Sequence, residues 1–187
     1  MEHNFQATYG HVRIRPLEEK DIELLRIWRN DPNKTQYLRK IGEITPEMQK
    51  AWFDRSQKNP DEVLFAIDEI QDLNRMVGSV ALYHFQDRTA EVGRIQVGDD
   101  QANGRGIGRI AMSLAVHVGI QQFGLHTLKA DVHTDNLAAY KSYMKMGFEV
   151  VGIHDCVIGG KEYELEIHPS ELYGNGFAPV DMQDGYK

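Results

Sequence analysis

The chain has 187 residues, of which 41% are hydrophobic and 26% are charged, and its formal net charge is -7 at pH 7. This length suits a domain that builds its core without disulfides, and the composition is typical of soluble globular proteins. The acidic balance argues against a general nucleic-acid binder, which needs a basic face. We therefore expect no nucleic-acid partner and one domain over residues 1–187, with a core at about 11–168 and an irregular C-terminal tail at 169–187.

Cysteine usage and apolar runs indicate the compartment. Cys156 is the one cysteine, so an intrachain disulfide is excluded, and a small buried side chain is the expected role rather than a nucleophile. Residues 1–5 lack the basic and apolar parts of a signal peptide, and no apolar run reaches the ~20 residues that span a bilayer. We expect a cytoplasmic protein without a membrane partner, either monomeric or homodimeric. The histidines lack metal-ligand spacing, so no metal is expected.

The first half of the chain predicts one strand, two helices and three more strands. Residues 11–15 alternate between apolar and polar side chains, which is typical of a strand. Asp21 is a candidate cap for a first helix, and Thr45 with Pro46 begins a second helix. Three strand-like runs follow with short polar joins, which indicate antiparallel hairpins, at about 62–69, 75–86 and 90–98.

The second half alternates between helices and strands. A helix runs from the glycine-rich segment to about residue 123, and the next ends at Gly147. Strands are expected at about 128–133, 148–157 and 161–167. The whole order, β-α-α-β-β-β-α-β-α-β-β, predicts an α/β (α+β) fold: a mixed, mostly antiparallel sheet with helices on both faces. The crossover from strand to helix to strand lies at about 90–133.

The most informative segment is the glycine-rich loop at 103–108, which follows a strand-like run and opens a helix. Glycines let a ligand approach the backbone closely, and a helix N-terminus presents free N–H groups and a positive dipole end. Three alternating glycines, with Arg105 and Arg109 beside them, favour an anion site over an ordinary turn. A pyrophosphate-bearing ligand is therefore expected here.

Two familiar phosphate loops fit this segment poorly. A Walker loop is excluded because no Lys-Ser/Thr pair follows the glycines. A dinucleotide fingerprint fits Gly106-x-Gly108-x-x-Ala111, with Asp131 twenty residues further on. However, that fingerprint needs a tight strand-to-helix turn, whereas eight residues separate Val97 from Gly106, and only one crossover follows the antiparallel strands. A nicotinamide-dependent enzyme is the less favoured alternative.

A third interpretation covers most of the chain. From about Val12 to Ile167 the order of elements resembles the GNAT superfamily of acyl-CoA N-acyltransferases, whose signature loop is Gln/Arg-x-x-Gly-x-Gly/Ala. Here Asn103 stands in place of the Gln or Arg, and the glycines match. A second motif of that family also matches in spacing, with the residues Asn136, Ala139, Tyr143 and Gly147-Phe148.

The resemblance implies that the acyl donor is acetyl-CoA. Main-chain groups of the fourth strand would pair with the pantetheine arm, and they belong to Ile95, Gln96 and Val97. The pyrophosphate would be held by groups of the glycine-rich loop and the start of the helix, which belong to Asn103, Gly104, Arg105, Gly106, Ile107, Gly108 and Arg109. Asn136 matches the family residue that touches the pantetheine arm. Gly93, inside a strand pattern, marks either a local splaying of strands or a simple small residue.

The resemblance also implies a reaction, the transfer of an acetyl group to a primary amine. Tyr143 matches the usual proton donor to the leaving sulfur, and an amide of the fourth strand would polarise the thioester carbonyl. The base that deprotonates the amine is ranked as Glu91, then Asp131, then His84, with His133 as a further candidate. A non-catalytic acyl-CoA-binding module is the alternative to an enzyme.

The acceptor is expected to lie over residues 22–53. The run at 25–30 resembles a branch of the superfamily that includes ribosomal-protein N-terminal acetyltransferases and acetyltransferases of nucleotide-linked amino sugars. Candidate acceptor-binding residues are Trp28, Arg29, Tyr37 and His84, whereas Trp52 is favoured as a core anchor. We expect a small-molecule amine such as a nucleotide-linked amino sugar, with a peptide N-terminus as the alternative.

Overall fold

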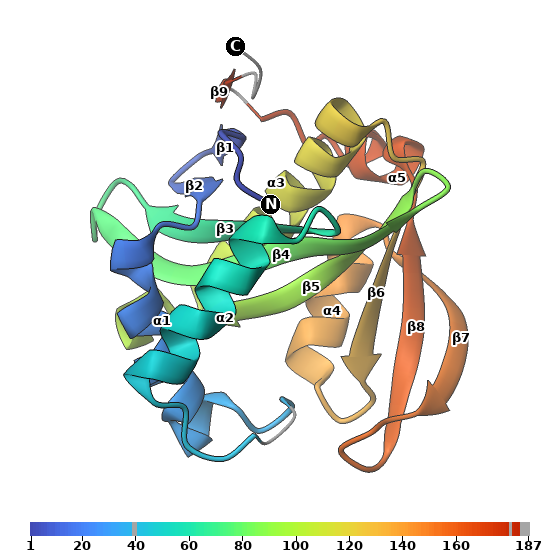
Figure 1. Ribbon diagram of the computed structural model, residues 1–187. Coiled ribbons are helices and arrows are strands. Elements are labelled where there is room, and N and C mark those ends of the chain that lie inside the picture. Colours follow the sequence, from blue (N-terminus) through green and yellow to red (C-terminus); the bar gives the residue numbers. More distant parts are fainter. Residues whose placement is uncertain (39–40, 180, 184–187) are drawn as a thin grey trace.

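The computed structural model describes residues 1–38, 41–179 and 181–183. Within them one sheet has the strand order β7-β8-β6-β5-β4-β3-β2-β1-β9 (Figure 1). Neighbouring strands are antiparallel except for β5 and β6, which are parallel. The strands are β1 (Gln6–Tyr9), β2 (Val12–Pro16), β3 (Glu62–Glu69), β4 (Arg75–Gln86), β5 (Thr89–Val97), β6 (Thr127–His133), β7 (Glu149–Asp155), β8 (Lys161–Ile167) and β9 (Asp181–Gln183).

Helices cover both faces of this sheet (Figure 1). On one face, α1 (Ile22–Asn30) and α2 (Pro46–Lys58) form an apolar cluster with β3 and β4. On the other face, α3 (Ile107–Phe123) and α4 (Leu137–Met146) pack into the main core, together with Leu172 of α5 (Pro169–Gly174). Short 3-10 turns are η1 (Glu19–Asp21), η2 (Pro32–Lys34) and η3 (Asp100–Ala102). The predicted mixed sheet with helices on both faces is confirmed.

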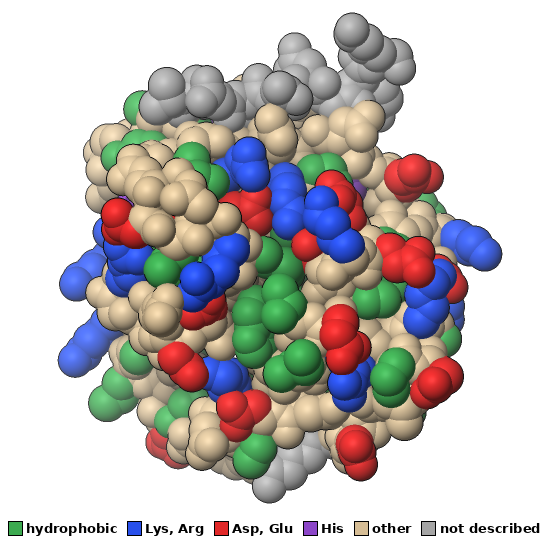
Figure 2. Space-filling view, turned by 90° about the vertical axis from the view of Figure 1, so that its left-hand side faces the viewer, with side chains coloured by type: hydrophobic (Ala, Val, Ile, Leu, Met, Phe, Trp, Pro, Cys, Tyr) green, Lys and Arg blue, Asp and Glu red, His purple; other side chains and the backbone are tan. Residues whose placement is uncertain are grey.

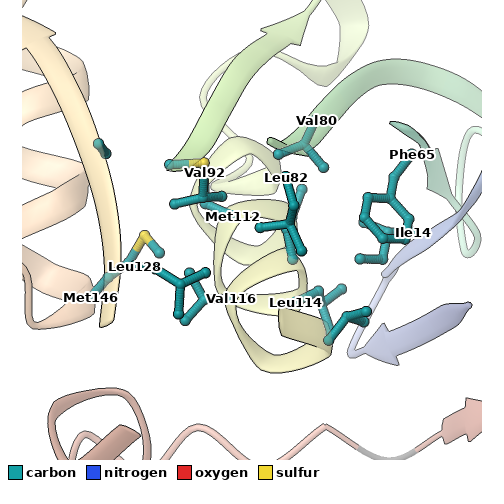
Figure 3. Close-up of a cluster of buried hydrophobic side chains, with 14 of the residues drawn as sticks. Ile14, Phe65, Val80, Leu82, Val92, Met112, Leu114, Val116, Leu128 and Met146 are labelled. Carbon is teal, nitrogen blue, oxygen red and sulfur yellow. The ribbon is translucent and has the colours of Figure 1, made fainter. Parts of the chain in front are cut away.

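The main core is the contact of α3 with the sheet. Met112, Leu114 and Val116 of the helix point toward apolar side chains of several strands (Figure 3). On β3 and β4 the residues that alternate with these partners, such as Leu64, Ala66 and Ala81, are apolar as well, because helices cover both faces of the sheet. They include Ile14, Phe65, Val80, Leu82, Val92 and Leu128.

Local signals fixed most helix ends. The Thr45 hydroxyl accepts a hydrogen bond from the Met48 N–H at 3.3 Å, and Pro46 occupies the first turn of α2. Gly147 ends α4 with a φ of 100°, a conformation that suits glycine. Asp21 is the residue before α1, as expected, but its side chain does not cap the helix. Its carboxylate instead binds the Arg15 guanidinium at 2.7 Å.

The two ends of the chain contain regular structure that the sequence analysis missed. β1 precedes the predicted first strand and pairs with it. The prediction that residues 169–187 are irregular was wrong in part, because α5 and β9 lie there and β9 extends the sheet next to β1. Residues 180 and 184–187 of that tail lie outside the described residues. The extent of a single domain stays a prediction.

Leu114→Ala should lower the free energy of unfolding by about 2–5 kcal/mol, because a fully buried side chain on α3 would leave a cavity in the core. The measurement is urea unfolding at pH 7. Leu137→Ala is the matched control, since that side chain is 61% exposed and its loss should cost far less. Equal losses for the two variants would contradict this assignment of the core.

Candidate active site

The sheet opens at the point where β5 and β6 part. Their parallel pairing covers only Thr89 to Glu91 of β5 and Thr127 to Lys129 of β6. Beyond Glu91 the strands diverge, and the remainder of β5 has no strand beside it on this edge (Figure 1). Unpaired main-chain groups on a strand edge can bind an extended ligand as an added strand. The predicted donor residues Ile95, Gln96 and Val97 lie on this open edge.

A β-bulge interrupts β5 at Arg94 and Ile95. Gly93 pairs with Ala81 and Gln96 pairs with Ser79, so two residues of β5 stand opposite the single residue Val80 of β4. Arg94 has a φ of 50°, a left-handed conformation that occurs at residues of β-bulges. The bulge re-aims the side chains of β5 and leaves main-chain groups outside the ladder with β4.

The glycine loop leads from η3 into α3. Gly104 and Gly106 both have a φ of 74°, and Gly106 is the N-cap of α3. A Cβ at either position would meet no atom within 4 Å, so the surface above the loop is open. The first turn of α3 carries no acidic side chain. An open, uncontested helix N-terminus fits a pyrophosphate group.

Arg105 and Arg109 have different surroundings. Arg105 forms an ion pair with Asp72, so a phosphate group would compete with that carboxylate. Arg109 is exposed on α3 and lines a small hollow together with Lys145 and Asn175. Asn136 caps α4, because its Oδ1 accepts a hydrogen bond from the Ala139 N–H at 3.2 Å, which leaves the amide nitrogen for a ligand.

Two phenols and two carboxylates influence one another where the strands part. Tyr143 of α4 is buried, and burial raises its pKa to about 12, with a further contribution from Asp131 of β6. Burial also raises the pKa of Tyr83 of β4, and the carboxylates of Glu91 and Asp131 raise it further. Both phenols therefore keep their protons at neutral pH.

Each of the two carboxylates has a histidine partner. His84 Nδ1 lies 2.9 Å from Glu91 Oε1, and His154 Nε2 of β7 lies 3.3 Å from Asp131 Oδ1. These hydrogen bonds are the main reason that the pKa of each histidine is raised. Such pairs can hold and move protons in the neutral range.

Arg94 reaches back across the sheet from the bulge. Its guanidinium carbon lies 4.4 Å from the centre of the Tyr83 ring, and it forms an ion pair with the buried Glu62 of β3. An ideal Cβ at Gly93 would lie 2.6 Å from the Tyr83 hydroxyl oxygen. Glycine at position 93 therefore leaves room for the phenol. The close approach of the Tyr83 hydroxyl explains why this position is a glycine.

A cavity of about 620 Å³ lies between the two helices of one face and the sheet, and it reaches the bulge of β5. Its size suits a small-molecule ligand. Hydrophobic side chains gather on the side of the molecule that carries α1, with Lys and Arg side chains beside them (Figure 2). The cavity wall includes Ile44, Met48, Trp52, Ile95, Gln96 and the three arginines Arg29, Arg55 and Arg94.

The predicted acceptor residues are dispersed. Arg29 lines the cavity, and burial lowers its pKa. Trp28 is 7% exposed and packs on Gly98, where a Cβ would lie 2.0 Å from the indole ring. The Tyr37 hydroxyl donates to the Asp135 carbonyl at 3.1 Å, and its ring lies near His133. The roles of these side chains stay predictions, and Trp52, expected as a core anchor, is the tryptophan in the cavity wall.

Sequence reasoning missed Tyr83, Arg94 and His154 as members of this site. His154 reaches Asp131 only because β8 pairs with both β6 and β7. Gly93 carried a signal for Tyr83, since a glycine inside a strand indicates a close approach. Arg94 gave no signal, because its direction depends on the bulge.

Comparison with known proteins now defines the class. The family model of the acetyltransferase (GNAT) domain matches residues 11–149. YnaD of Bacillus subtilis (strain 168), an uncharacterized N-acetyltransferase, is 24% identical over 158 residues, which are 83% of this chain and 90% of that protein. The acetyltransferase PseH of Campylobacter jejuni is 25% identical over 134 residues, covering 72% of this chain and 80% of that protein. The structure of spermidine N-acetyltransferase from Vibrio cholerae, in complex with CoA and spermine, shares the fold with a TM-score of 0.78 and 19% identity, covering 88% of this chain and 99% of that one.

The chain therefore belongs to the GNAT acetyltransferase family. It is an acetyl-CoA-dependent N-acetyltransferase, so the nicotinamide-dependent and non-catalytic alternatives are set aside. The open glycine loop, the acid-free first turn of α3 and the unpaired edge of β5 fit the pyrophosphate and pantetheine parts of this donor.

Residues 1–38, 41–179 and 181–183 show neither a metal site nor a membrane-spanning helix. No group of three His, Cys, Asp or Glu side chains there is arranged to hold a metal ion. No helix in that part of the chain is long and apolar enough to cross a bilayer. Cys156 is buried, as expected. The cytoplasmic location and a homodimeric state stay predictions.

Gly93→Ala should lower the free energy of unfolding by about 1–3 kcal/mol, because the new methyl group would collide with the Tyr83 hydroxyl. In a Tyr83→Phe background most of this loss should disappear, since the nearest ring carbons lie at 3.5 Å, an ordinary contact. A double-mutant cycle by chemical unfolding measures this coupling.

Gly108→Ala is the control for that cycle, because its Cβ would lie 3.6 Å from the Val97 side chain and needs no rearrangement. It should cost the same in both backgrounds. If Gly93→Ala also cost the same with and without the Tyr83 hydroxyl, the close contact would not be the reason for glycine at position 93.

Proposed function

We propose that this enzyme acetylates the primary amine of a small molecule, and that the acceptor is an amino sugar linked to a nucleotide. The observation that carries the proposal is a bounded cavity of about 620 Å³ that ends at the bulge of β5, beside the carboxylates and phenols at the strand gap. An acceptor in this cavity presents its amine to those proton-transfer groups.

The donor half of the site consists mostly of backbone. The N–H groups from Gly104 to Gly108 hold the pyrophosphate, and main-chain groups of β5 beyond Gly93 pair with the pantetheine arm. Bound acetyl-CoA supplies an acetyl thioester. An N–H group of β5 near the bulge then stabilises the negative charge that develops on the carbonyl oxygen.

Tyr143 gives its proton to the leaving sulfur. Its pKa of about 12, set first by burial, keeps the phenol protonated at neutral pH, so the hydroxyl is a donor there. α4 begins at the Asn136 cap and ends at Gly147, and these two ends fix the register that brings Tyr143 to the gap. Phe148 packs against the phenol ring with its centre 5.5 Å away.

Glu91 is the base. It is the last residue of β5 that pairs with β6, it faces Tyr83 across the ladder, and its carboxylate is half-exposed and bound to His84. A proton taken from the substrate ammonium by Glu91 passes to His84 and then to solvent, since the His84 side chain is 62% exposed. Asp131 with His154 is the second candidate pair.

The size of the cavity favours a small acceptor over a peptide N-terminus. A volume of about 620 Å³ falls in the range of small-molecule sites, and its apolar wall with the indole of Trp52 can pack on a sugar or a base. Arg29 belongs to that wall. The peptide N-terminus remains an alternative that an acceptor panel tests.

The direct test is release of free thiol from acetyl-CoA with a panel of amines: a nucleotide-linked amino sugar, glucosamine, spermidine and a peptide with a free N-terminus. Tyr143→Phe should lower kcat by ~10²-fold or more while the dissociation constant of acetyl-CoA changes little. Tyr140→Phe, on the same helix, is the control and should keep its kcat. An unaltered kcat in Tyr143→Phe would remove this residue from the reaction.

Exchange of each carboxylate for its amide should separate the two candidate bases. We expect Glu91→Gln to lower kcat by ~10-fold or more, because the amide cannot accept the ammonium proton, and Asp131→Asn to have a smaller effect. The measurement is kcat over pH 6 to 9 for both variants. The reverse ranking would assign the base to Asp131 and His154.

A further inference from the structure

The charged groups in the wall of the acceptor cavity are all cations. Arg29, Arg55 and Arg94 line it, and no carboxylate is found among the described residues of the wall. Arg55 makes no ion pair with any described residue. Burial lowers the pKa of Arg94 and that of Arg29, because it removes water from their guanidinium groups.

Glu62 compensates the charge of Arg94. It is buried on β3 and pairs with Arg94 beside Tyr83, and it does not belong to the cavity wall. Arg55 of α2 also lies in the wall, and it forms no ion pair with a described residue. The cavity wall is therefore rich in hydrogen-bond donors, which an anionic, acceptor-rich ligand satisfies.

Gln96 provides an independent sign of a missing partner. Its side-chain nitrogen is buried and has no hydrogen-bond partner in the described structure, and the residue lines the same cavity. A buried donor without an acceptor costs about 1–3 kcal/mol. The position of Gln96, after the bulge and opposite Ser79, places it on the face of the sheet that carries the cavity.

The opposite charge gathers across the strand gap. On β6 and β8, Asp131 stands opposite Glu164, and Lys129 stands opposite Glu166 and binds it at 3.1 Å. With Glu91 on β5, these carboxylates make the proton-transfer side of the gap acidic, whereas the cavity side is basic. An acceptor that joins the two sides has a cationic amine at one end and an anion at the other.

We infer that the cavity binds a phosphate group of the acceptor through Arg55, Arg94 and the side-chain amide of Gln96, so that the enzyme selects phosphate-bearing amines over polyamines. This rests on the proposed function and assigns the part of the site that holds the non-reacting end of the acceptor. A guanidinium group and a phosphate pair with two parallel hydrogen bonds, which gives direction as well as affinity. A polyamine brings further cationic groups to the arginines and is repelled there.

The first test compares three amines that differ in their anion: glucosamine, glucosamine 6-phosphate and muramic acid, which carries a carboxylate. Spermidine is the cationic comparison. We expect the KM for glucosamine 6-phosphate to be ~10-fold or more below that for glucosamine, as one charge-assisted hydrogen bond would give. If the KM for muramic acid were as low as that for glucosamine 6-phosphate, the site would accept any oxyanion, and the assignment to phosphate would be overturned.

The second test changes the proposed contacts. Arg55→Gln should raise the KM for glucosamine 6-phosphate by ~10-fold and thereby remove the preference over glucosamine. Lys58→Gln is the matched control, because it removes one exposed positive charge from the same helix outside the cavity wall. If the two variants behaved alike, the effect would be one of net charge and the assigned contact would be wrong.

Gln96→Leu separates a binding role from a structural one. Replacing an unpaired buried amide by an apolar side chain of similar size should leave the free energy of unfolding unchanged or raised, while the KM for glucosamine 6-phosphate rises. A loss of stability without a change in that KM would show that the amide serves the fold and would overturn its assignment.

A binding measurement distinguishes failure of this inference from failure of the proposed function. UMP, which has no primary alkylamine, is titrated against the intrinsic fluorescence to which Trp52 contributes. If no amine of the panel is acetylated but UMP binds and Arg55→Gln weakens it, the proposed function fails and the phosphate site stands. If spermidine is acetylated as well as glucosamine 6-phosphate and UMP does not bind, the phosphate site fails and the acetyltransferase stands.

Discussion

The organisation of this enzyme depends on one unmade set of hydrogen bonds, the main-chain groups of β5 beyond Glu91. Buried backbone groups almost always have partners, so an open strand edge inside a sheet is costly unless something else satisfies it. Here β6 turns away after three paired residues, and α3 starts behind the opening with its own N–H groups free. The start of α3 lies beside this part of β5, since a Cβ at Gly108 would be 3.6 Å from the Val97 side chain, so a single extended, phosphate-bearing ligand can reach both sets of groups.

Side chains on the face of the sheet that carries α1 and α2 support the open edge of β5. Glycine at position 93 admits the Tyr83 hydroxyl, the bulge turns Arg94 over the phenol ring, and Glu62 holds the guanidinium from β3. These contacts join three strands at the height of the opening. They also separate two electrostatic surroundings, with carboxylates toward β6 and guanidinium groups toward α2.

The features that sequence reasoning predicted well are those with local causes. The bounds of β3 and β4 follow from apolar runs that end at short polar joins, and the glycine loop follows from the φ values that glycine allows. The missed features depend on pairing across the sheet. His154 meets Asp131 only through the β7-β8-β6 order, and the sequence alone does not indicate which tryptophan lines the cavity, because the direction of each helix face depends on packing. β1 was missed because four residues give too short a pattern.

Trp28 is the structural link between the two halves of the reaction. Its indole ring belongs to α1, which lines the cavity, and it rests directly on the backbone of Gly98, five residues before Asn103 at the start of the glycine loop. Because nothing larger than a hydrogen atom fits between ring and backbone, α1 cannot tilt without moving the chain that leads to this loop. A shift of the cavity wall on α1 is therefore coupled to the position of the glycine loop.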